Sequence, residues 1–202
     1  MAERVVNIIG MGISAKQVPD TGENWVINVA YKRIPTGKVN KVFFFDDFPS
    51  FLSDDPIIPP VDYTFLKMLK DNPEVEVISR YAENITIPTG EVVGKVSSYP
   101  LEKALDLAYI GYFTSSMAYT ICYAILEKVD RIRLYGFEVW SGCDSNEYAF
   151  QRPCVDFWLA FAMGRGIKIE LPYYMIHTLS PETNYFYGYA KKELIKNSQL
   201  NK

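Results

Sequence analysis

Short apolar runs bounded by turn residues recur along the chain and predict buried strands. The first run is Val5–Ile9, which ends at Gly10, Met11 and Gly12. Runs that are apolar throughout, without alternation, are typical of central strands in a parallel sheet covered on both faces. Further strands are expected at residues 25–31, 41–45, 75–79, 131–135 and 167–171.

Segments with the apolar spacing of helices lie between these strands. Residues 113–128 are apolar nearly all round, which predicts a buried crossover helix. Pro153 suits the first turn of a second helix that follows a polar loop at 139–151 and stops near Gly164 and Gly166. Residues 63–70 and 101–109 are also expected to be helical, and residues 80–100 to form a hairpin or an inserted loop.

The alternation of strand and helix predicts one doubly wound α/β domain with a mostly parallel sheet and helices on both faces. The 202 residues are 49% hydrophobic and 22% charged, a composition that fits a single globular domain. No run approaches the roughly 18 apolar residues of a membrane helix, and the first residues have no signal-peptide pattern. We therefore expect a cytoplasmic protein with no membrane partner.

Charge and cysteine content narrow the classes of ligand. The chain has 21 basic and 24 acidic residues, and its basic residues are scattered except at 191–202, so a nucleic-acid partner is not expected. Three cysteines without CxxC spacing and a single histidine, His177, are a poor zinc set. We expect no metal site and no separate cofactor.

The residues directly after each predicted strand are the candidates for a binding site, because ligands of open α/β sheets lie outside the carboxyl ends of the strands. Gly10, Gly12 and Ser14 follow the first strand, where small residues let backbone N–H groups approach an anion. A plain tight turn explains the same residues. Asn28 is polar within an apolar run and contacts either the ligand or the first turn.

Three hydroxyl residues, Thr114, Ser115 and Ser116, open the predicted helix at 113–128. They either cap that helix or hold a ligand at its N-terminus. Gly136 and Phe137 end the following strand, where a glycine permits close approach of a base or ribose.

Two charged residues extend this set. Glu138 follows Phe137 and can accept hydrogen bonds from ligand hydroxyl groups. Arg152, in segment 148–153, is expected beside a helix N-terminus, where it either pairs with a phosphate or pins its own loop to Asp144 or Glu147.

Segments 9–14, 113–119 and 131–138, together with Asn28, resemble a Rossmann-like superfamily. It holds bacterial sialyltransferases, motility accessory factor-type glycosyltransferases and the archaeal hydroxymethylpterin pyrophosphokinase. Segments 148–153 and 164–167 are most similar to small uncharacterised phage members of that superfamily. The resemblance implies a nucleotide-binding domain at residues 1–180, followed by an aromatic and basic extension at 181–202. The residues that would line the nucleotide site are Gly12, Ser14, Asn28, Thr114, Ser115 and Gly136.

The resemblance implies a glycosyltransferase that uses a sugar nucleotide, with His177 or Glu138 as the general base. Met11 and Ile13 stand where the transferases carry a polar residue or Gly-Pro-Ser, so two alternatives stay open. One is a non-catalytic phage protein that sequesters a host nucleotide signal in the host cytoplasm. The other is a phage structural or assembly factor with a relic cleft.

Aromatic residues crowd the stretch 173–189 after the last predicted strand. Exposed clusters of tyrosine and phenylalanine usually mark subunit interfaces. We expect a homo-oligomer held partly by this region, with a ligand lid as the alternative use of the same residues.

Overall fold

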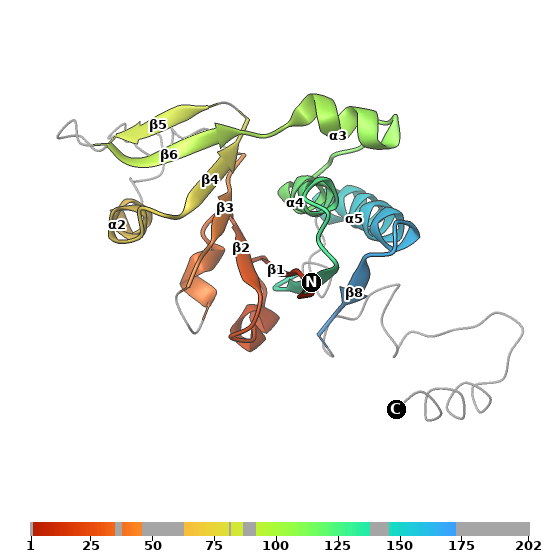
Figure 1. Ribbon diagram of the computed structural model, residues 1–202, viewed down its shortest axis with the longest axis horizontal. Helices are drawn as coiled ribbons and strands as arrows, with labels where there is room; N and C mark the ends of the chain where they lie inside the picture. The colour runs from red at the N-terminus through yellow and green to blue at the C-terminus, as the bar shows by residue number, and fades with distance from the viewer. Residues whose placement is uncertain are drawn as a thin grey trace, which may run out of the picture.

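The computed structural model describes residues 2–34, 38–45, 63–80, 82–86, 92–137 and 146–172. Within these residues, eight strands form one sheet in the order β5-β6-β4-β3-β2-β1-β7-β8 (Figure 1). Every neighbouring pair is parallel except β5 and β6. The predicted α/β fold with a mostly parallel sheet is therefore confirmed. The strands are β1 Val5–Ile9, β2 Glu23–Ile27, β3 Lys41–Phe43, β4 Glu76–Ser79, β5 Glu83–Thr86, β6 Val92–Ser98, β7 Arg131–Tyr135 and β8 Lys168–Glu170.

Helices cover both faces of the sheet, as the two-sided apolar strands require. On one face lie α3 (Leu101–Ala108), α4 (Ser116–Leu126) and α5 (Asn146–Gly164). The other face is covered by α2 (Tyr63–Asp71) and two short 3₁₀ helices, η1 (Ile13–Gln17) and η2 (Ala30–Arg33). Figure 1 shows the two layers on opposite sides of the strands.

The side chains of the central strands feed two separate cores. Val6 and Ile8 of β1 belong to the core beneath α4 and α5, whereas Ile9 belongs to the core beneath η1, η2 and α2. Trp25 and Val26 of β2 divide in the same way, and all five of these side chains are fully buried. Alternation of sides along an apolar strand explains why the sequence pattern there is continuous.

The strand predicted at residues 25–31 ends at Ile27, although the apolar pattern continues beyond it. Asn28 adopts a positive φ of 51° and donates its N–H to the carbonyl of Phe43 at 2.9 Å. Asparagine tolerates this left-handed conformation better than most residues, and it turns the chain away from the sheet into η2.

The predicted start of the last helix is wrong. α5 begins at Asn146, inside the segment predicted as a loop, and Pro153 lies within the helix. An internal proline removes a hydrogen bond and crowds the preceding turn, at a cost of about 3 kcal/mol. Packing offsets this cost, because Cys154, Val155 and Trp158 of the same helix are buried in the core against α4 and the sheet.

The prediction of a hairpin between residues 80 and 100 is confirmed by the antiparallel pair β5 and β6. β6 also pairs in parallel with β4, so the hairpin extends the sheet by two strands. The chain then passes through α3 and α4 and returns to β7 beside β1. Because β7 lies on the other side of β1 from β2, the order of the strands reverses at β1.

Candidate functional site

The strand order reverses direction at β1. From β1 the chain proceeds to β2 through η1 on one face, whereas β7, its other neighbour, is reached through α4 on the opposite face. Loops that leave a sheet on opposite faces open a crevice at the carboxyl ends of the two strands. The β1 and β7 pair is therefore the switch point, and Gly10 and Gly136 directly follow these strands.

Two glycines bring the two loops into backbone contact at this point. The N–H of Gly12 donates to the carbonyl of Gly136 at 2.9 Å, and the N–H of Gly10 donates to the carbonyl of Tyr135 at 2.8 Å. A Cβ on Gly10 would lie 2.5 Å from the carbonyl oxygen of Gly136. A Cβ on Gly136, whose φ is +72°, would lie 2.3 Å from the carbonyl oxygen of Gly10. Side chains at either position would force the strand ends apart.

Ser14 of η1 also contributes to this contact between the two loops. Its side chain is fully buried, and its Oγ accepts the N–H of Gly136 at 2.7 Å. The hydroxyl thus satisfies a buried backbone donor that sits across the switch point. Ser14 therefore holds the two loops together and presents no surface to a ligand.

The residues predicted around the first and seventh strands therefore fall into two groups. Gly10, Ser14, Gly136 and Phe137 are buried framework, and Phe137 belongs to the core beneath α4 and α5. Gly12 is partly exposed at the edge of the junction. Only Gly12 of this set can offer surface to a ligand.

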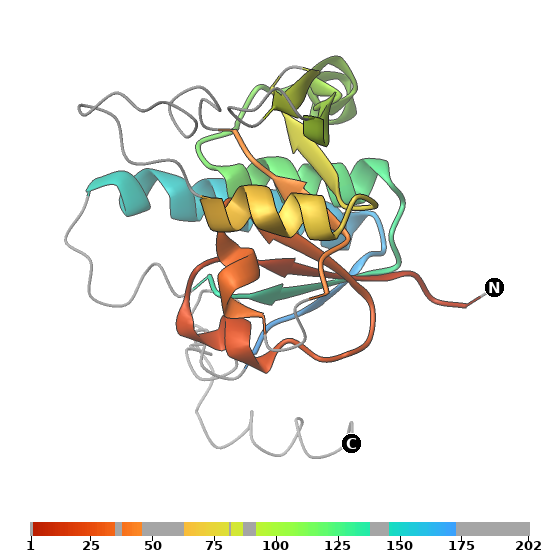
Figure 2. The same ribbon diagram turned by 90° about the vertical axis from the view of Figure 1, so that its left-hand side faces the viewer.

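The N-terminus of α4 is the second part of the site. Ser115 is its N-cap, and the Ser115 Oγ accepts the N–H of Ala118 at 3.4 Å. α4 precedes the parallel strand β7 and runs opposite to it, so its N-terminus lies at the carboxyl edge of the sheet (Figure 2). Thr114 is exposed and Ser116 partly so. The capping role predicted for these hydroxyls is present at Ser115, and the helix N-terminus favours an anion.

Aromatic side chains hold the first turns of α4 against the strand ends. Tyr119 stacks on Phe45, which follows β3, with ring centroids 4.6 Å apart, and on Phe113 at 4.4 Å. The hydroxyl of Tyr99, which follows β6, donates to the carbonyl of Tyr119 at 3.1 Å. Burial raises the pKa of Tyr119, so its phenol stays protonated. Sequence reasoning missed these residues, although Tyr99 directly follows β6 and Phe45 lies two residues after β3.

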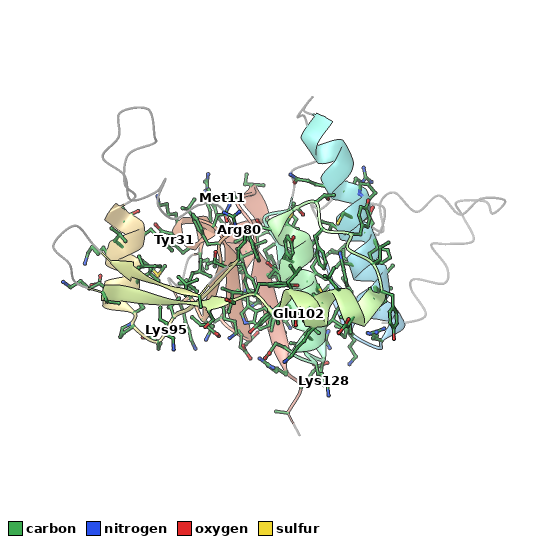
Figure 3. The ribbon with its side chains drawn as sticks, turned by 90° about the horizontal axis from the view of Figure 1, so that it is seen from above. Met11, Tyr31, Arg80, Lys95, Glu102 and Lys128 are labelled. Carbon is green, nitrogen blue, oxygen red and sulfur yellow. The ribbon has the colours of Figure 1, made fainter. Side chains whose placement is uncertain are left out.

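Exposed apolar and basic side chains mark the same edge. Figure 3 shows Met11, Tyr31 and Arg80 together along the carboxyl edge of the sheet, with Lys128 at the opposite edge. Met11 is 43% exposed and Ile13 is 73% exposed. A ligand at this edge would therefore meet an apolar surface over part of its area.

Several ion pairs lie at the amino ends of the strands instead. Arg4 pairs with Glu23 at 2.9 Å and with Glu127 at 3.3 Å. Burial tends to raise the pKa of Glu23, but the hydrogen bonds from Arg4 and Trp25 lower it by more. These side chains hold together the amino end of the sheet, which is the end opposite the switch point.

The position predicted for Arg152 is wrong, because it lies in the second turn of α5 and not beside the first turn. The first turns of α5 project beyond the carboxyl edge of the sheet (Figures 2 and 3). Arg152 Nε lies 3.9 Å from Asp156 Oδ2 one turn later, a weak pairing that leaves the guanidinium partly exposed. Arg152 therefore stays on the same side of the sheet as the crevice.

The two predicted general bases, Glu138 and His177, lie outside the described residues, as do Asp144 and the aromatic stretch 173–189. No group of three or more metal-ligating side chains comes together within the part of the chain that the structure describes. None of the described helices is long and apolar enough to cross a membrane.

Comparison with known proteins finds similarity at the level of structure. No model of a known protein family matches the sequence, and no curated protein matches it. The sialyltransferase CstII from Campylobacter jejuni, in complex with cytidine-5'-monophosphate, superposes with a TM-score of 0.52 at 16% identity, over 91% of this chain and 84% of that one.

Two further structures of CstII agree. The complex with a trisaccharide acceptor and CMP gives a TM-score of 0.52 at 18% identity, over 83% of this chain and 80% of that one. A mutant of the same alpha-2,3/8-sialyltransferase gives 0.51 at 19% identity, over 83% and 81%. At these identities the likeness shows the fold alone: the chain has the Rossmann-like α/β fold of this sialyltransferase.

Proposed function

We propose that this protein binds a nucleotide-type ligand at the carboxyl edge of the sheet, between β1 and β7. The observation that carries the proposal is the switch point itself, where Gly10 and Gly136 pack backbone to backbone beside the N-terminus of α4. The N-terminus of α4 supplies partial positive charge for a phosphate. The exposed Met11 and Ile13 supply an apolar surface for a base or sugar face.

Within this site, Gly12, Asn28, Thr114 and the Ser115–Ser116 pair are the residues in reach of the ligand, and Arg152 is the cation that reaches the phosphate. CMP is the first ligand to test, because the structurally similar CstII is bound to it. The proposed reaction is transfer of a sugar from its nucleotide, in which His177 or Glu138 takes the proton of the acceptor hydroxyl as the glycosidic bond to phosphate breaks.

Titration calorimetry of the full chain with CMP, UMP and AMP tests the binding. Arg152→Ala removes one charge-assisted contact and is expected to weaken CMP binding about tenfold to a hundredfold. Lys95→Ala removes an exposed charge from β6, on the opposite edge in Figure 3, and is expected to leave the affinity unchanged. Heat release with none of the three nucleotides, or equal affinities of the Arg152→Ala and wild-type chains, contradicts the proposal.

Binding without turnover is the second candidate, and the apolar first turn favours it. Met11 and Ile13 offer no group that can activate a hydroxyl or hold a leaving group. Incubation with CMP-linked and UMP-linked sugars, followed by heat denaturation and mass spectrometry of the released ligand, separates the two candidates. Free CMP or UMP in the supernatant supports transfer or hydrolysis, and recovery of intact sugar nucleotide supports binding alone.

A further inference from the structure

Helix α3 packs Ala104, Leu107 and Ala108 against the core but leaves two of its leucines exposed. Ala104 is fully buried against the core, and Ala108 is partly buried. Leu101 is 46% exposed and Leu105 is 38% exposed, one turn apart on the outer side. A surface helix normally directs its large apolar residues to the core, because their burial is what stabilises it. The outer side of α3 therefore has the pattern of a covered surface.

The residues that follow α3 extend this surface. Tyr109 is 95% exposed and Ile110 is 46% exposed. Tyr109 also has a positive φ of 54° at the C-cap of α3, where glycine or asparagine is the usual residue. This conformation costs a tyrosine about 1 kcal/mol or more. An exposed aromatic ring in an unfavourable conformation gains its stabilisation only if another segment packs on it.

We call Leu101, Leu105, Tyr109 and Ile110 the α3 stripe. The helical positions next to the stripe carry Glu102, Lys103 and Asp106, all exposed. An apolar strip beside a net negative charge fits a segment that is apolar or aromatic and also basic.

We propose that the α3 stripe is the docking site of the chain's own C-terminal extension, residues 181–202. That extension contains Tyr185, Phe186, Tyr187 and Tyr189, followed by four lysines at 191, 192, 196 and 202 against two glutamates at 182 and 193. Its aromatic part matches the stripe and its net positive charge matches Glu102 and Asp106. The composition of the extension therefore complements the apolar and acidic side chains of the stripe and its neighbours.

The covalent path is short enough for docking within one chain. Arg165, at the end of α5, donates to the carbonyl of Leu107 in α3 at 3.1 Å. Pro172 follows seven residues later, within about 25 Å of Arg165 along the chain, and any eight residues beyond it can span at most about 28 Å. A tethered segment has an effective concentration of about a millimolar, which favours its own α3 over that of a second molecule. Docking of the extension on a second molecule, as in the oligomer predicted from the sequence, is the alternative that the experiment must distinguish.

Limited trypsin digestion of the full chain tests the docking, with cleavage after Lys191, Lys192 and Lys196 followed by mass spectrometry. When docking is fast, the cleavage rate reports the undocked fraction. The double variant Leu105→Gln/Tyr109→Ser removes apolar area from the stripe, and we expect cleavage at these lysines to become about tenfold faster.

A second variant and a matched control isolate the cause. Glu102→Lys/Asp106→Lys reverses the charge beside the stripe and is expected to accelerate cleavage by a similar factor, with less acceleration at high salt. Val92→Thr changes another exposed apolar residue, on β6, and is expected to leave cleavage unchanged. Unfolding midpoints in urea equal to that of the wild type verify that the variants fold.

Three results overturn the proposal. The first is cleavage at the three lysines that is as fast in the wild type as in both double variants. The second is acceleration by Val92→Thr as large as that by the stripe variants. The third is protection that falls when the protein is diluted about a hundredfold, since only docking on a second molecule depends on concentration.

Discussion

A series of glycine-to-alanine substitutions tests whether the switch point is held by close backbone contact. Gly136→Ala places a Cβ at φ +72° and 2.3 Å from the carbonyl oxygen of Gly10, which is backbone and cannot swing away. The left-handed conformation costs an alanine about 1–2 kcal/mol. Separating the loops adds about 1–3 kcal/mol of overpacking, which also strains the Ser14 and Gly12 hydrogen bonds at the junction. We expect a loss of about 2–5 kcal/mol in the free energy of unfolding.

Three other glycines separate the contributions. Gly10→Ala introduces a clash at 2.5 Å without a positive φ, and we expect a loss of about 1–3 kcal/mol. Gly166→Ala keeps a φ of +84° but meets no atom within 4 Å, so only the conformational cost of about 1–2 kcal/mol remains. Gly164→Ala has neither problem at the last turn of α5 and is expected to be neutral or stabilising by about 0.5 kcal/mol.

Urea unfolding followed by tryptophan fluorescence measures all four variants under the same conditions. With a denaturant dependence of about 2 kcal/mol per molar, Gly136→Ala is expected to lower the midpoint by about 1–2.5 M. A Gly136→Ala chain no less stable than Gly166→Ala would refute the reasoning, because the contact with Gly10 would then contribute nothing. Equal stability of Gly10→Ala and Gly164→Ala would refute it in the same way.

Three further variants test other contacts. Ser14→Ala leaves the buried N–H of Gly136 without its acceptor, so urea unfolding should show a loss of about 1–3 kcal/mol, and a loss below about 0.5 kcal/mol contradicts the role of the hydroxyl. Arg4→Met removes the partner that lowers the pKa of Glu23. A carboxyl whose pKa is lowered in the folded state stabilises that state at pH values above its unfolded pKa of about 4.3. Because the ion pair is partly exposed, Arg4→Met should lower the free energy of unfolding by about 0.5–1 kcal/mol at pH 7, and this loss should vanish in acid. A loss that persists below about pH 3 contradicts the ion pair. Burial raises the pKa of Cys122 to about 11, so the folded state keeps a proton that the unfolded thiol loses above about 8.5. The stability of the wild type relative to Cys122→Ala should therefore fall by about 1 kcal/mol between about pH 7.5 and 9.5, and a constant difference contradicts the raised pKa.

Local patterns along the sequence were sufficient for most elements of the fold. The run Val5–Ile9 predicted a buried strand, and the nearly all-apolar segment of α4 predicted a buried helix. A segment that is buried on two sides needs apolar residues, whichever elements pack against it. Ser115 was recognisable as a cap since its hydroxyl bonds a backbone N–H only three residues away. Glycines and hydroxyls directly after strands were recognisable as neighbours of a crevice on general grounds of α/β topology.

The tertiary structure alone decided which of these residues are framework and which face a ligand. Gly10 and Gly136 are 126 residues apart in the sequence. Only the pairing of β1 with β7 brings their backbones so close that neither position has room for a side chain. The same pairing buries Ser14 beneath Gly136, where a sequence pattern indicates a surface turn. Pro153 lies inside α5 because distant core contacts outweigh the local preference of proline for the first turn. Local preferences amount to about 1–3 kcal/mol per residue, and packing between elements distant in sequence supplies as much or more, so the contacts of the assembled fold decide.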